Sequence, residues 1–356
     1  MAKSTPSHRP RPLRPSSNDG AFLRTFAVTF VGLLAGIAAL VRIIDPLAAF
    51  GTGVLPPIVS ADRDYKAALY RARRPSPEVV LLGSSRIKTL RPECVRELTG
   101  ESAFNFGVNA GVAEDFLAIF RFMRAQPGFR LRQVLLGVEP EAFIGSAQVG
   151  RSPVQSRMLG PFVSQAPADP DRLWSDLLSE ASVMAAVRSA WHYSFDRQAL
   201  PQEKLDPDGL QMRPRWDHEI SAGQFPQQSV VLSTSRAIRA RYLGDPQLAP
   251  ARLAQLQLLL REARVAGVTV TAFVPPVHPA LARDAAGTSF QRLTEGLVQV
   301  LRSAEADGML QYVETRSLAD FAGDSTLYYD AIHMTAGNAD RLLAAVYRGR
   351  GRCAVQ

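Results

Sequence analysis

Cysteine is scarce in this sequence. The 356 residues include only Cys94 and Cys353, which lie far apart and lack CxxC spacing. This excludes a disulfide framework and the common zinc-binding patterns. A single bond between the two would suit an oxidising compartment, but the composition favours a buried thiol at Cys94 and a free thiol at Cys353 in a frayed tail. The histidines show no metal-ligand spacing and no phosphate-binding or dinucleotide-binding glycine loop follows a strand-like run, so we expect neither metal nor cofactor.

Basic clusters interleaved with aromatic residues are also missing from the body of the chain. The formal net charge is +8, and residues 1–24 hold half of it, since five basic residues there face one acid (+5 − 1 = +4). The remaining chain therefore carries only +8 − 4 = +4. Without a basic footprint, a zinc finger or a helix-turn-helix pattern, nucleic acid is not an expected partner.

The N-terminal region contains one long uncharged run. It covers Thr25–Val41 between Arg24 and Arg42, and Ile43 and Ile44 extend it. At about 1.5 Å per residue, such a run crosses a bilayer core of ~30 Å. We expect a basic, disordered cytoplasmic tail over residues 1–24 and a single-pass signal anchor over 25–44, with the rest of the chain extracytoplasmic. A signal peptide cleaved near residues 47–49 is the alternative, which the length of the run disfavours.

The body of the chain alternates short apolar runs with helical patterns. The strand-like runs are 78–83, 133–138 and 268–274, and the helical patterns include 113–124 and 251–266. This alternation predicts an α/β fold, a three-layer doubly wound and mostly parallel sheet that binds its ligands at the carboxyl ends of the strands.

The domain organisation follows from the same pattern. Residues 45–77 are interpreted as a linker and a surface helix, and 78–350 as the α/β domain. Residues 141–247, which contain all three tryptophans, interrupt the alternation, so we interpret them as an inserted cap over the active edge.

A serine pair follows the first expected strand, in Leu82-Gly83-Ser84-Ser85-Arg86. A serine at a strand-to-helix turn projects its hydroxyl at the sheet edge, and its own backbone N–H can face a developing oxyanion. Taken alone, the pair is more typical of helix capping.

A second motif, Asp330-Ala331-Ile332-His333, lies near the C-terminus. This spacing lets one short loop hold both side chains, with the carboxylate fixing the imidazole tautomer and the imidazole free to deprotonate a serine. In isolation, an N-capping Asp330 and a surface His333 before the final helix is the favoured interpretation.

A third motif runs from Phe104 to Gly111. Its small residues permit close backbone approach, so an N–H of Gly107 or Gly111, or an amide of Asn105 or Asn109, could complete an oxyanion hole. The alternative is a plain strand ending in a turn.

Together these three motifs resemble the SGNH (GDSL-type) hydrolase superfamily, a flavodoxin-like α/β fold. The resemblance implies Ser85 as nucleophile in preference to Ser84, with Asp330 and His333 completing the triad. It implies an oxyanion hole formed by Ser85 with Gly107, Gly111 or Asn109. The chain is most similar to the membrane-anchored bacterial branch that includes proteins of alginate O-acetylation and teichoic-acid D-alanylation.

One block departs from the family pattern. The third block normally carries Gly-x-Asn-Asp, whereas the matching strand here ends in Gly137-Val138-Glu139-Pro140. Arg86, Glu139 and His278 are candidate substrate-binding residues, because each follows a strand that ends at the active edge. His278 is alternatively a second base or an exposed loop residue.

The resulting hypothesis is a periplasmic serine esterase or O-acyltransferase anchored in the bacterial inner membrane. It would take an acyl group from an acylated glycan or another acyl donor, with a membrane-bound acyltransferase as a candidate partner. The alternative is a non-catalytic protein of the same fold that binds glycan or acts as a scaffold for such a partner.

Overall fold

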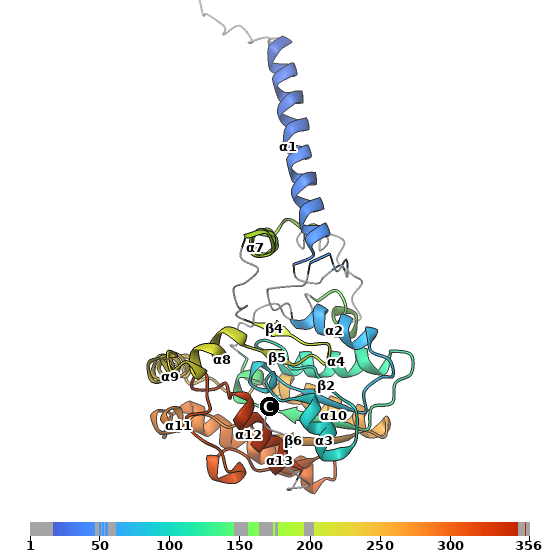
Figure 1. The fold of residues 1–356 in the computed structure, drawn as a ribbon. Helices are drawn as coiled ribbons and strands as arrows, with labels where there is room; N and C mark the ends of the chain where they lie inside the picture. Colours follow the sequence, from blue (N-terminus) through green and yellow to red (C-terminus); the bar gives the residue numbers. More distant parts are fainter. Residues whose placement is uncertain are drawn as a thin grey trace, which may run out of the picture.

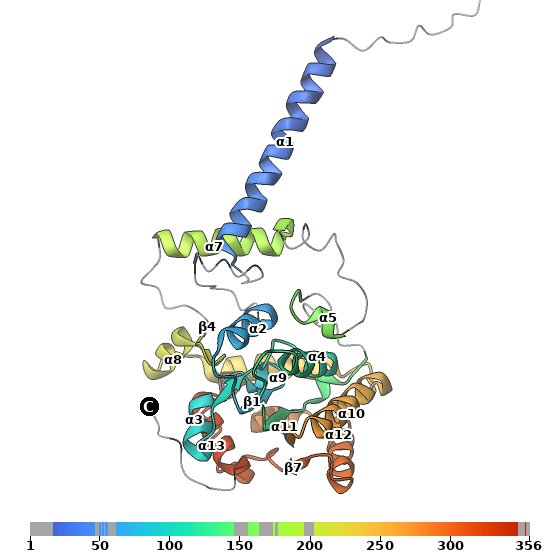
Figure 2. The ribbon, with the colours of Figure 1, turned by 90° about the vertical axis from the view of Figure 1, so that its right-hand side faces the viewer.

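The computed structural model describes residues 17–46, 50, 52, 54–55, 62–145, 156–163, 174, 177–195, 203–347 and 353. Figures 1 and 2 show an α/β domain from which one long helix projects.

Five parallel strands form the central sheet, in the order β2-β1-β3-β6-β7. The strands are β1 (Val79–Leu82), β2 (Ala103–Asn105), β3 (Gln133–Gly137), β6 (Thr269–Phe273) and β7 (Gln311–Val313). The chain order reverses between β1 and β3, so the crevice at their carboxyl ends is where such a sheet offers room for a ligand. The predicted parallel α/β sheet is confirmed, and each of the three predicted strands lies within its expected range.

Helices cover both faces of the sheet because alternate strand residues point to opposite sides. Val80 and Leu82 join the core beneath α4 (Ala113–Arg124) and α10 (Pro250–Val265). Val79 and Leu81 join a second core beneath α3 (Pro92–Thr99) and α13 (Ala336–Val346). The strands β1, β3 and β6 are buried on both faces over most of their length, which is why continuous apolar runs identified them.

The remaining helices and short strands lie between or beside these elements. They are α2 (Asp62–Ala72), η1 (Ser85–Ile87), η2 (Pro140–Ala142), α5 (Gly160–Val163), α7 (Glu180–Phe195), the hairpin β4 (Lys204–Leu205) and β5 (Gln211–Met212), α8 (Pro214–Ser221), α9 (Gln227–Arg241), α11 (Pro279–Asp284), α12 (Ser289–Ala306) and η4 (Leu318–Phe321). The segments η2, α5, α7, β4, β5, α8 and α9 arise from the predicted insertion 141–247.

The N-terminal helix α1 (Ser17–Ile44) stands away from the domain. Residues Gly20–Ile44 are long and apolar enough to cross a membrane, with a mean hydropathy of 2.3. The helix begins before the predicted start of the span at Thr25, and its end at Ile44 agrees with the prediction. Of the expected N-terminal tail, residues 1–16 lie outside the described residues.

The helix expected on the surface within residues 45–77 is largely buried, so that part of the prediction is wrong. In α2, Arg63 pairs with the buried carboxylate of Asp115 at 2.6 Å, and the ammonium of Lys66 donates to Asn105 at 3.3 Å. A charged side chain tolerates burial when a partner satisfies it. These partners come from α4 and β2, which are remote in sequence, so the charge pattern of α2 alone misled the prediction.

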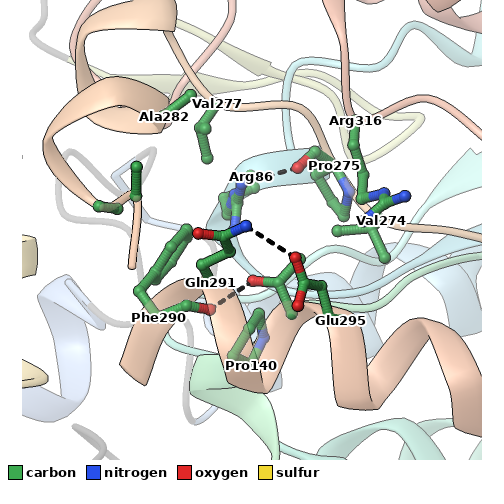
Figure 3. Close-up of a pocket in the computed structure, with 13 residues that line it drawn as sticks. Arg86, Pro140, Val274, Pro275, Val277, Ala282, Phe290, Gln291, Glu295 and Arg316 are labelled. Atoms are coloured by element: carbon green, nitrogen blue, oxygen red, sulfur yellow. Dashed lines mark hydrogen bonds between the residues drawn. The ribbon is translucent and has the colours of Figure 1, made fainter. Parts of the chain in front are cut away.

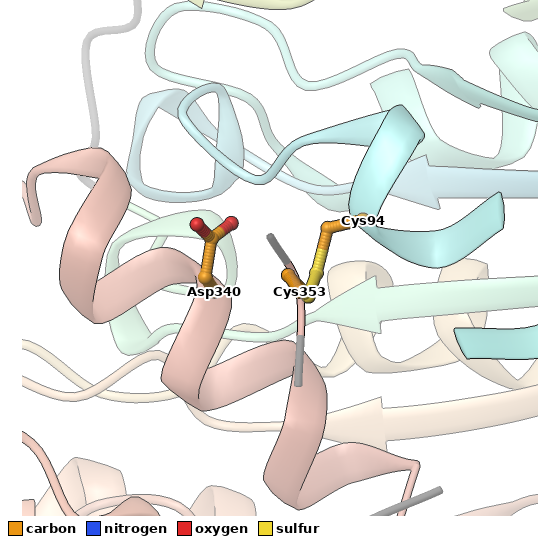
Figure 4. Close-up of side chains that lie close together, drawn as sticks. All are labelled: Cys94, Asp340 and Cys353. Atoms are coloured by element: carbon orange, nitrogen blue, oxygen red, sulfur yellow. A yellow bond between two sulfur atoms is a disulfide. The ribbon is translucent and has the colours of Figure 1, made fainter. Parts of the chain in front are cut away.

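The expectation of two free thiols is also wrong. Cys94 of α3 and Cys353 form a disulfide with their Cα atoms 5.1 Å apart, which ties the C-terminal segment to the second core (Figure 4). Asp340 lies beside them, and among the described residues this is the one cluster with the spacing of a metal site. Because the disulfide consumes both thiolates, the cluster offers no usable ligand set.

Candidate active site

Two adjacent serines at the end of β1 have different surroundings. The hydroxyl of Ser84 accepts a hydrogen bond from the backbone N–H of Arg86 at 3.3 Å, so Ser84 caps the short helix η1. The hydroxyl of Ser85 instead lies 2.9 Å from Nε2 of His333. The capping interpretation therefore applies to Ser84, while Ser85 is the serine next to a base.

The loop before α13 holds His333 and Asp330 in a fixed relation. Nδ1 of His333 lies 2.7 Å from Oδ2 of Asp330. The other carboxylate oxygen, Oδ1, accepts the backbone N–H groups of Ile332 and His333, each at 2.8 Å. With both oxygens occupied, the carboxylate orients the imidazole and leaves Nε2 directed at Ser85.

Protonation states follow from this arrangement. Burial would raise the pKa of Asp330, but the hydrogen bonds and charge of His333 and the two backbone N–H groups outweigh it and hold the pKa at about 2. Burial lowers the pKa of His333, Asp330 opposes this shift, and the positive charge of Arg213 reinforces it. At neutral pH the pair is a carboxylate beside a neutral imidazole, which is the form that can accept a proton from serine.

A cavity of about 520 Å³ opens in front of this serine. Five of the predicted site residues line it: Ser85, Arg86, Gly111, Glu139 and His333. Ser84, Ala110, Glu141, Ile144, Ile238, Arg241, Tyr242 and Ile332 complete the wall. Residues from η2 and the end of α9 thus close one side, so part of the predicted insertion does border the site.

Arg86 and Glu139 form a buried polar wall in this cavity. Nη2 of Arg86 donates to the carbonyl of Pro275 at 2.7 Å, and its Nη1 lies 3.8 Å from the carboxylate of Glu141. Nε and Nη1 of Arg86 and Oε2 of Glu139 make no hydrogen bond within the described residues. Native buried polar groups almost always have partners, so unsatisfied ones beside a cavity mark a place for ligand atoms.

Burial raises the pKa of Glu139 to about 8; the positive charge of Arg86 opposes this shift and the negative charge of Glu141 adds to it. One buried cation cannot neutralise two neighbouring carboxylates. Glu139 is therefore the member of this cluster that holds a proton at neutral pH, and a protonated carboxyl can donate a hydrogen bond.

The two glycines predicted as oxyanion donors occupy different positions relative to the cavity. Gly111 lines the cavity, and its N–H donates to the carbonyl of Val108 at 3.2 Å. Gly107 is not among the lining residues; its N–H donates to Oδ1 of Asn105 at 2.9 Å. A Cβ at Gly107 would lie 2.8 Å from Cδ1 of Ile87, so close packing requires glycine there. Of the two eligible glycines, Gly111 is the one that lines the cavity, but the N–H groups of both already donate within the chain.

The two asparagines of this motif are engaged elsewhere. Oδ1 of Asn109 accepts from the ammonium of Lys88 at 2.9 Å, and Asn109 is not among the residues that line the cavity. Asn105 is fully buried, and its amide donates to the carbonyls of Ile87 and Leu90, each at 2.8 Å. The amide donors of Asn105 are therefore used within the fold, while Asn109 contacts Lys88 through its oxygen and lies outside the cavity wall.

The side chain of His278 caps a helix and packs against a neighbouring ring. Its Nδ1 accepts the backbone N–H of Ala280 at 3.1 Å, which caps the start of α11, and its ring packs edge-on against Tyr328. Its own backbone N–H donates to the carbonyl of Ala331 at 2.9 Å, so it supports the loop that carries His333. It does not line the Ser85 cavity, and neither the substrate-contact nor the second-base interpretation is supported.

A second, smaller cavity of about 250 Å³ also borders Arg86 (Figure 3). Its wall is mostly apolar, with Val274, Pro275, Val277 and Phe290, and its polar residues include Gln291 and Glu295. Arg86 borders both cavities, whereas Ser85 and His333 border only the larger one. The nucleophile candidate therefore belongs to the larger cavity.

Sequence reasoning missed several residues of the site. Glu141 and Tyr242 line the cavity, and Arg213 packs over the rings of Trp216 and Tyr329 at 4.6 and 4.9 Å. Tyr329 in turn bonds Asp217 through its hydroxyl, which fastens α8 to the His333 loop. Glu141 follows β3 closely and could have been found by its strand-end position. Arg213 and Tyr242 come from the insertion, where no periodic pattern pointed to them.

No protein-family model matches the chain, and no curated protein matches it in sequence. Three solved structures are similar in arrangement. A provisionally named acylhydrolase from Bacteroides fragilis is 8% identical, with 82% of this chain and 95% of that chain covered and a TM-score of 0.36. A GDSL-like lipase from Bacteroides thetaiotaomicron is 10% identical, with 80% and 93% covered and a TM-score of 0.35. A provisionally named platelet activating factor from Streptococcus pneumonia is 9% identical, with 82% and 93% covered and a TM-score of 0.38.

Proposed function

We propose that the domain is a serine-dependent esterase or acyltransferase with Ser85 as nucleophile, His333 as base and Asp330 as the residue that orients the base. The observation that carries the proposal is the continuous line of contacts, 2.9 Å from Ser85 Oγ to His333 Nε2 and 2.7 Å from His333 Nδ1 to Asp330. These distances are within hydrogen-bond reach, and the serine borders an open cavity.

In the first half-reaction, Oγ of Ser85 attacks the carbonyl carbon of an ester as Nε2 of His333 takes its proton. The tetrahedral intermediate collapses, the ester C–O bond breaks, and the leaving oxygen takes the proton back from His333. The acyl group then remains on Ser85.

In the second half-reaction, an O–H group attacks the acyl carbon and gives its proton to His333. The bond to Ser85 breaks and its Oγ recovers that proton. Water as acceptor makes the reaction hydrolysis, and a sugar hydroxyl makes it transfer.

The tetrahedral intermediate needs hydrogen-bond donors. The backbone N–H of Ser85 is the first candidate among the predicted residues that border the cavity, and the N–H of Gly111 could serve only if its bond to the carbonyl of Val108 is released. Asn105 does not take this role, because its amide donates to the carbonyls of Ile87 and Leu90, and Asn109 does not line the cavity.

Arg86 and Glu139 favour a polar substrate rich in oxygen atoms. Arg86 supplies N–H donors and neutral Glu139 an O–H donor, and each has at least one atom without a partner among the residues that the structure describes. Hydroxyl and carbonyl oxygens of an acylated glycan would satisfy these groups, whereas a purely aliphatic ligand would leave them buried and unpaired.

The proposed location is the extracytoplasmic face of a bacterial inner membrane, with α1 as the anchor. Two observations support it. Basic residues precede the apolar helix, which favours a cytoplasmic N-terminus, and the disulfide Cys94–Cys353 is typical of an oxidising compartment. A membrane-bound acyltransferase that delivers the acyl group is the partner this location would permit.

A fluorophosphonate probe tests the proposal, because it labels serines activated by a neighbouring base. We expect labelling of the wild-type chain at Ser85, loss of labelling in Ser85→Ala and retention in Ser84→Ala. A folded wild-type protein that stays unlabelled would favour the alternative, a non-catalytic domain that binds glycan or supports a partner enzyme.

A further inference from the structure

Helix α7 carries an apolar stripe that nothing in the described structure covers. Met184, Val187, Trp191 and Phe195 are 45, 48, 63 and 74% exposed. Their spacing of three, four and four residues places them on one face of the helix. The rings of Trp191 and Phe195 lie 4.8 Å apart, so the stripe ends in an aromatic pair. We call these four residues the α7 stripe.

The opposite face of α7 packs on the end of α1. Ala186 is fully buried in a cluster with Ala38, Val41 and Ile44 of α1, and Ala185 is buried as well. Figures 1 and 2 show α7 running crosswise at the foot of α1, set apart from the sheet domain. The small residues of this face let the two helices approach closely, and the stripe points away from α1.

The contact lies at the depth where α1 would leave a membrane. The apolar segment Gly20–Ile44 has 25 residues, which at about 1.5 Å each is ~37 Å, against a hydrocarbon core of ~30 Å. The last turns of α1 therefore stand at the boundary between acyl chains and headgroups. Leu40 and Ile43 in these turns are 44 and 54% exposed, so lipid would surround α1 at this level wherever α7 does not.

We propose that α7 lies flat in the membrane surface, with the α7 stripe immersed at the boundary of headgroups and acyl chains. The inference rests on the proposed anchoring by α1. Trp191 then occupies the interfacial layer that tryptophan prefers, and the exposed Arg188 beside it can reach lipid phosphates. Two attached helices would restrict rotation about the α1 axis, which a single span leaves free, so the mouth of the active site would keep a fixed orientation to the bilayer.

Fluorescence of a single tryptophan tests this in the full-length chain. The protein Trp174→Phe/Trp216→Tyr keeps only Trp191, and the matched control Trp174→Phe/Trp191→Phe keeps only Trp216, which packs against Tyr329 in the domain. Both are reconstituted into phosphatidylethanolamine–phosphatidylglycerol vesicles that contain lipids brominated near the head or near the end of the acyl chain. Circular dichroism verifies that each variant is folded.

We expect lipids brominated near the head to reduce Trp191 emission about two-fold or more, and more than lipids brominated near the chain end, as for a residue buried ~5–10 Å deep. Aqueous iodide should quench Trp191 little, and brominated lipid should leave Trp216 unchanged.

If iodide quenches Trp191 and brominated lipid does not, in a protein that resists carbonate extraction, the inference is overturned while the anchor stands. Shielding of Trp191 from both quenchers would also overturn it and would indicate a protein partner on the stripe. Release of the chain by carbonate would overturn the anchor itself, and the inference with it.

Discussion

Ser85 Oγ and His333 Nε2 lie 2.9 Å apart although 248 residues separate them in the sequence. The sheet brings them together, since Ser85 follows β1 and the loop of His333 leads into α13, which packs with α3 on the same face of β1. Ser84, one residue away, is committed to capping η1. The position of each side chain in the fold, and not its residue type, therefore separates the two serines.

Replacing Ser85 with alanine should abolish ester hydrolysis. We expect a fall in kcat/KM on the order of 10⁴-fold or more, because the attacking oxygen is lost. Ser84→Ala should lose only a capping hydrogen bond, about 1 kcal/mol of stability, and keep most of its activity. Hydrolysis of a chromogenic acetyl ester measures both. Equal losses in the two variants would contradict the assignment.

The pH dependence of the reaction should report His333. Because burial lowers the pKa of its imidazole, the neutral, proton-accepting form persists below the ordinary pKa of ~6.5. As pH falls through the lowered pKa the base is protonated, so kcat/KM should decline with a midpoint below ~6.5. A midpoint above 7 in the wild type would contradict the protonation states inferred for Asp330 and His333.

Asp330→Asn should reduce the rate of ester hydrolysis about 10³–10⁴-fold, since the tautomer of His333 is no longer fixed.

Glu139 should act as a neutral donor. Glu139→Gln keeps an N–H donor of similar shape, so it should retain activity at neutral pH, whereas Glu139→Ala should lower kcat/KM about 10-fold through the missing hydrogen bond. Steady-state kinetics on an acylated sugar measures the difference. If Gln and Ala are equally damaging, the carboxylate form is the one required.

The same residue should make stability depend on pH in a predictable direction. The pKa of Glu139 is raised to about 8 in the folded protein, so folding takes up a proton between its ordinary value and about pH 8. The wild type should therefore lose stability as pH rises through this window, whereas Glu139→Gln has no such proton to lose. Relative to wild type, the variant should gain on the order of a few kcal/mol between pH 5 and pH 9. Urea denaturation at the two pH values checks this, and a difference that stays constant would contradict it.

Much of this architecture could be predicted from local pattern. The strands β1, β3 and β6 could be recognised as continuous apolar runs, because a strand that is buried on both faces needs apolar residues throughout. The helix α4 matches its predicted range of 113–124. The resemblance of the motifs to the SGNH hydrolases implied that Ser85, Asp330 and His333 would meet, and in the structure His333 lies 2.9 Å from Ser85 and 2.7 Å from Asp330.

The failures share a physical cause, which is dependence on distant partners. The mixed charges of α2 indicated a solvent-exposed helix that includes Lys66, because no residue nearby in the sequence showed that the ammonium of Lys66 would donate a hydrogen bond to Asn105. Gly107 looked like an oxyanion donor, but it packs against Ile87 across the ends of two strands. The strand β7 has only three residues and no fully buried position, so it left no apolar run to recognise.

The disulfide Cys94–Cys353 was missed for the same reason, and it gives a separate test of how the C-terminus is held. It joins residues 259 positions apart, and both sulfurs lie in the second core with Leu81 and Leu343. A cross-link that closes so long a loop restricts the unfolded chain strongly, so Cys353→Ser should lower the free energy of unfolding by about 2–4 kcal/mol.

Denaturation of the full-length chain in detergent, with and without dithiothreitol, measures this change in the free energy of unfolding. The reductant should destabilise the wild type and leave Cys353→Ser unchanged. Because neither cysteine touches the Ser85 cavity, fluorophosphonate labelling of the folded variant should persist. A variant as stable as the wild type would mean that the bond does not hold the C-terminus in solution.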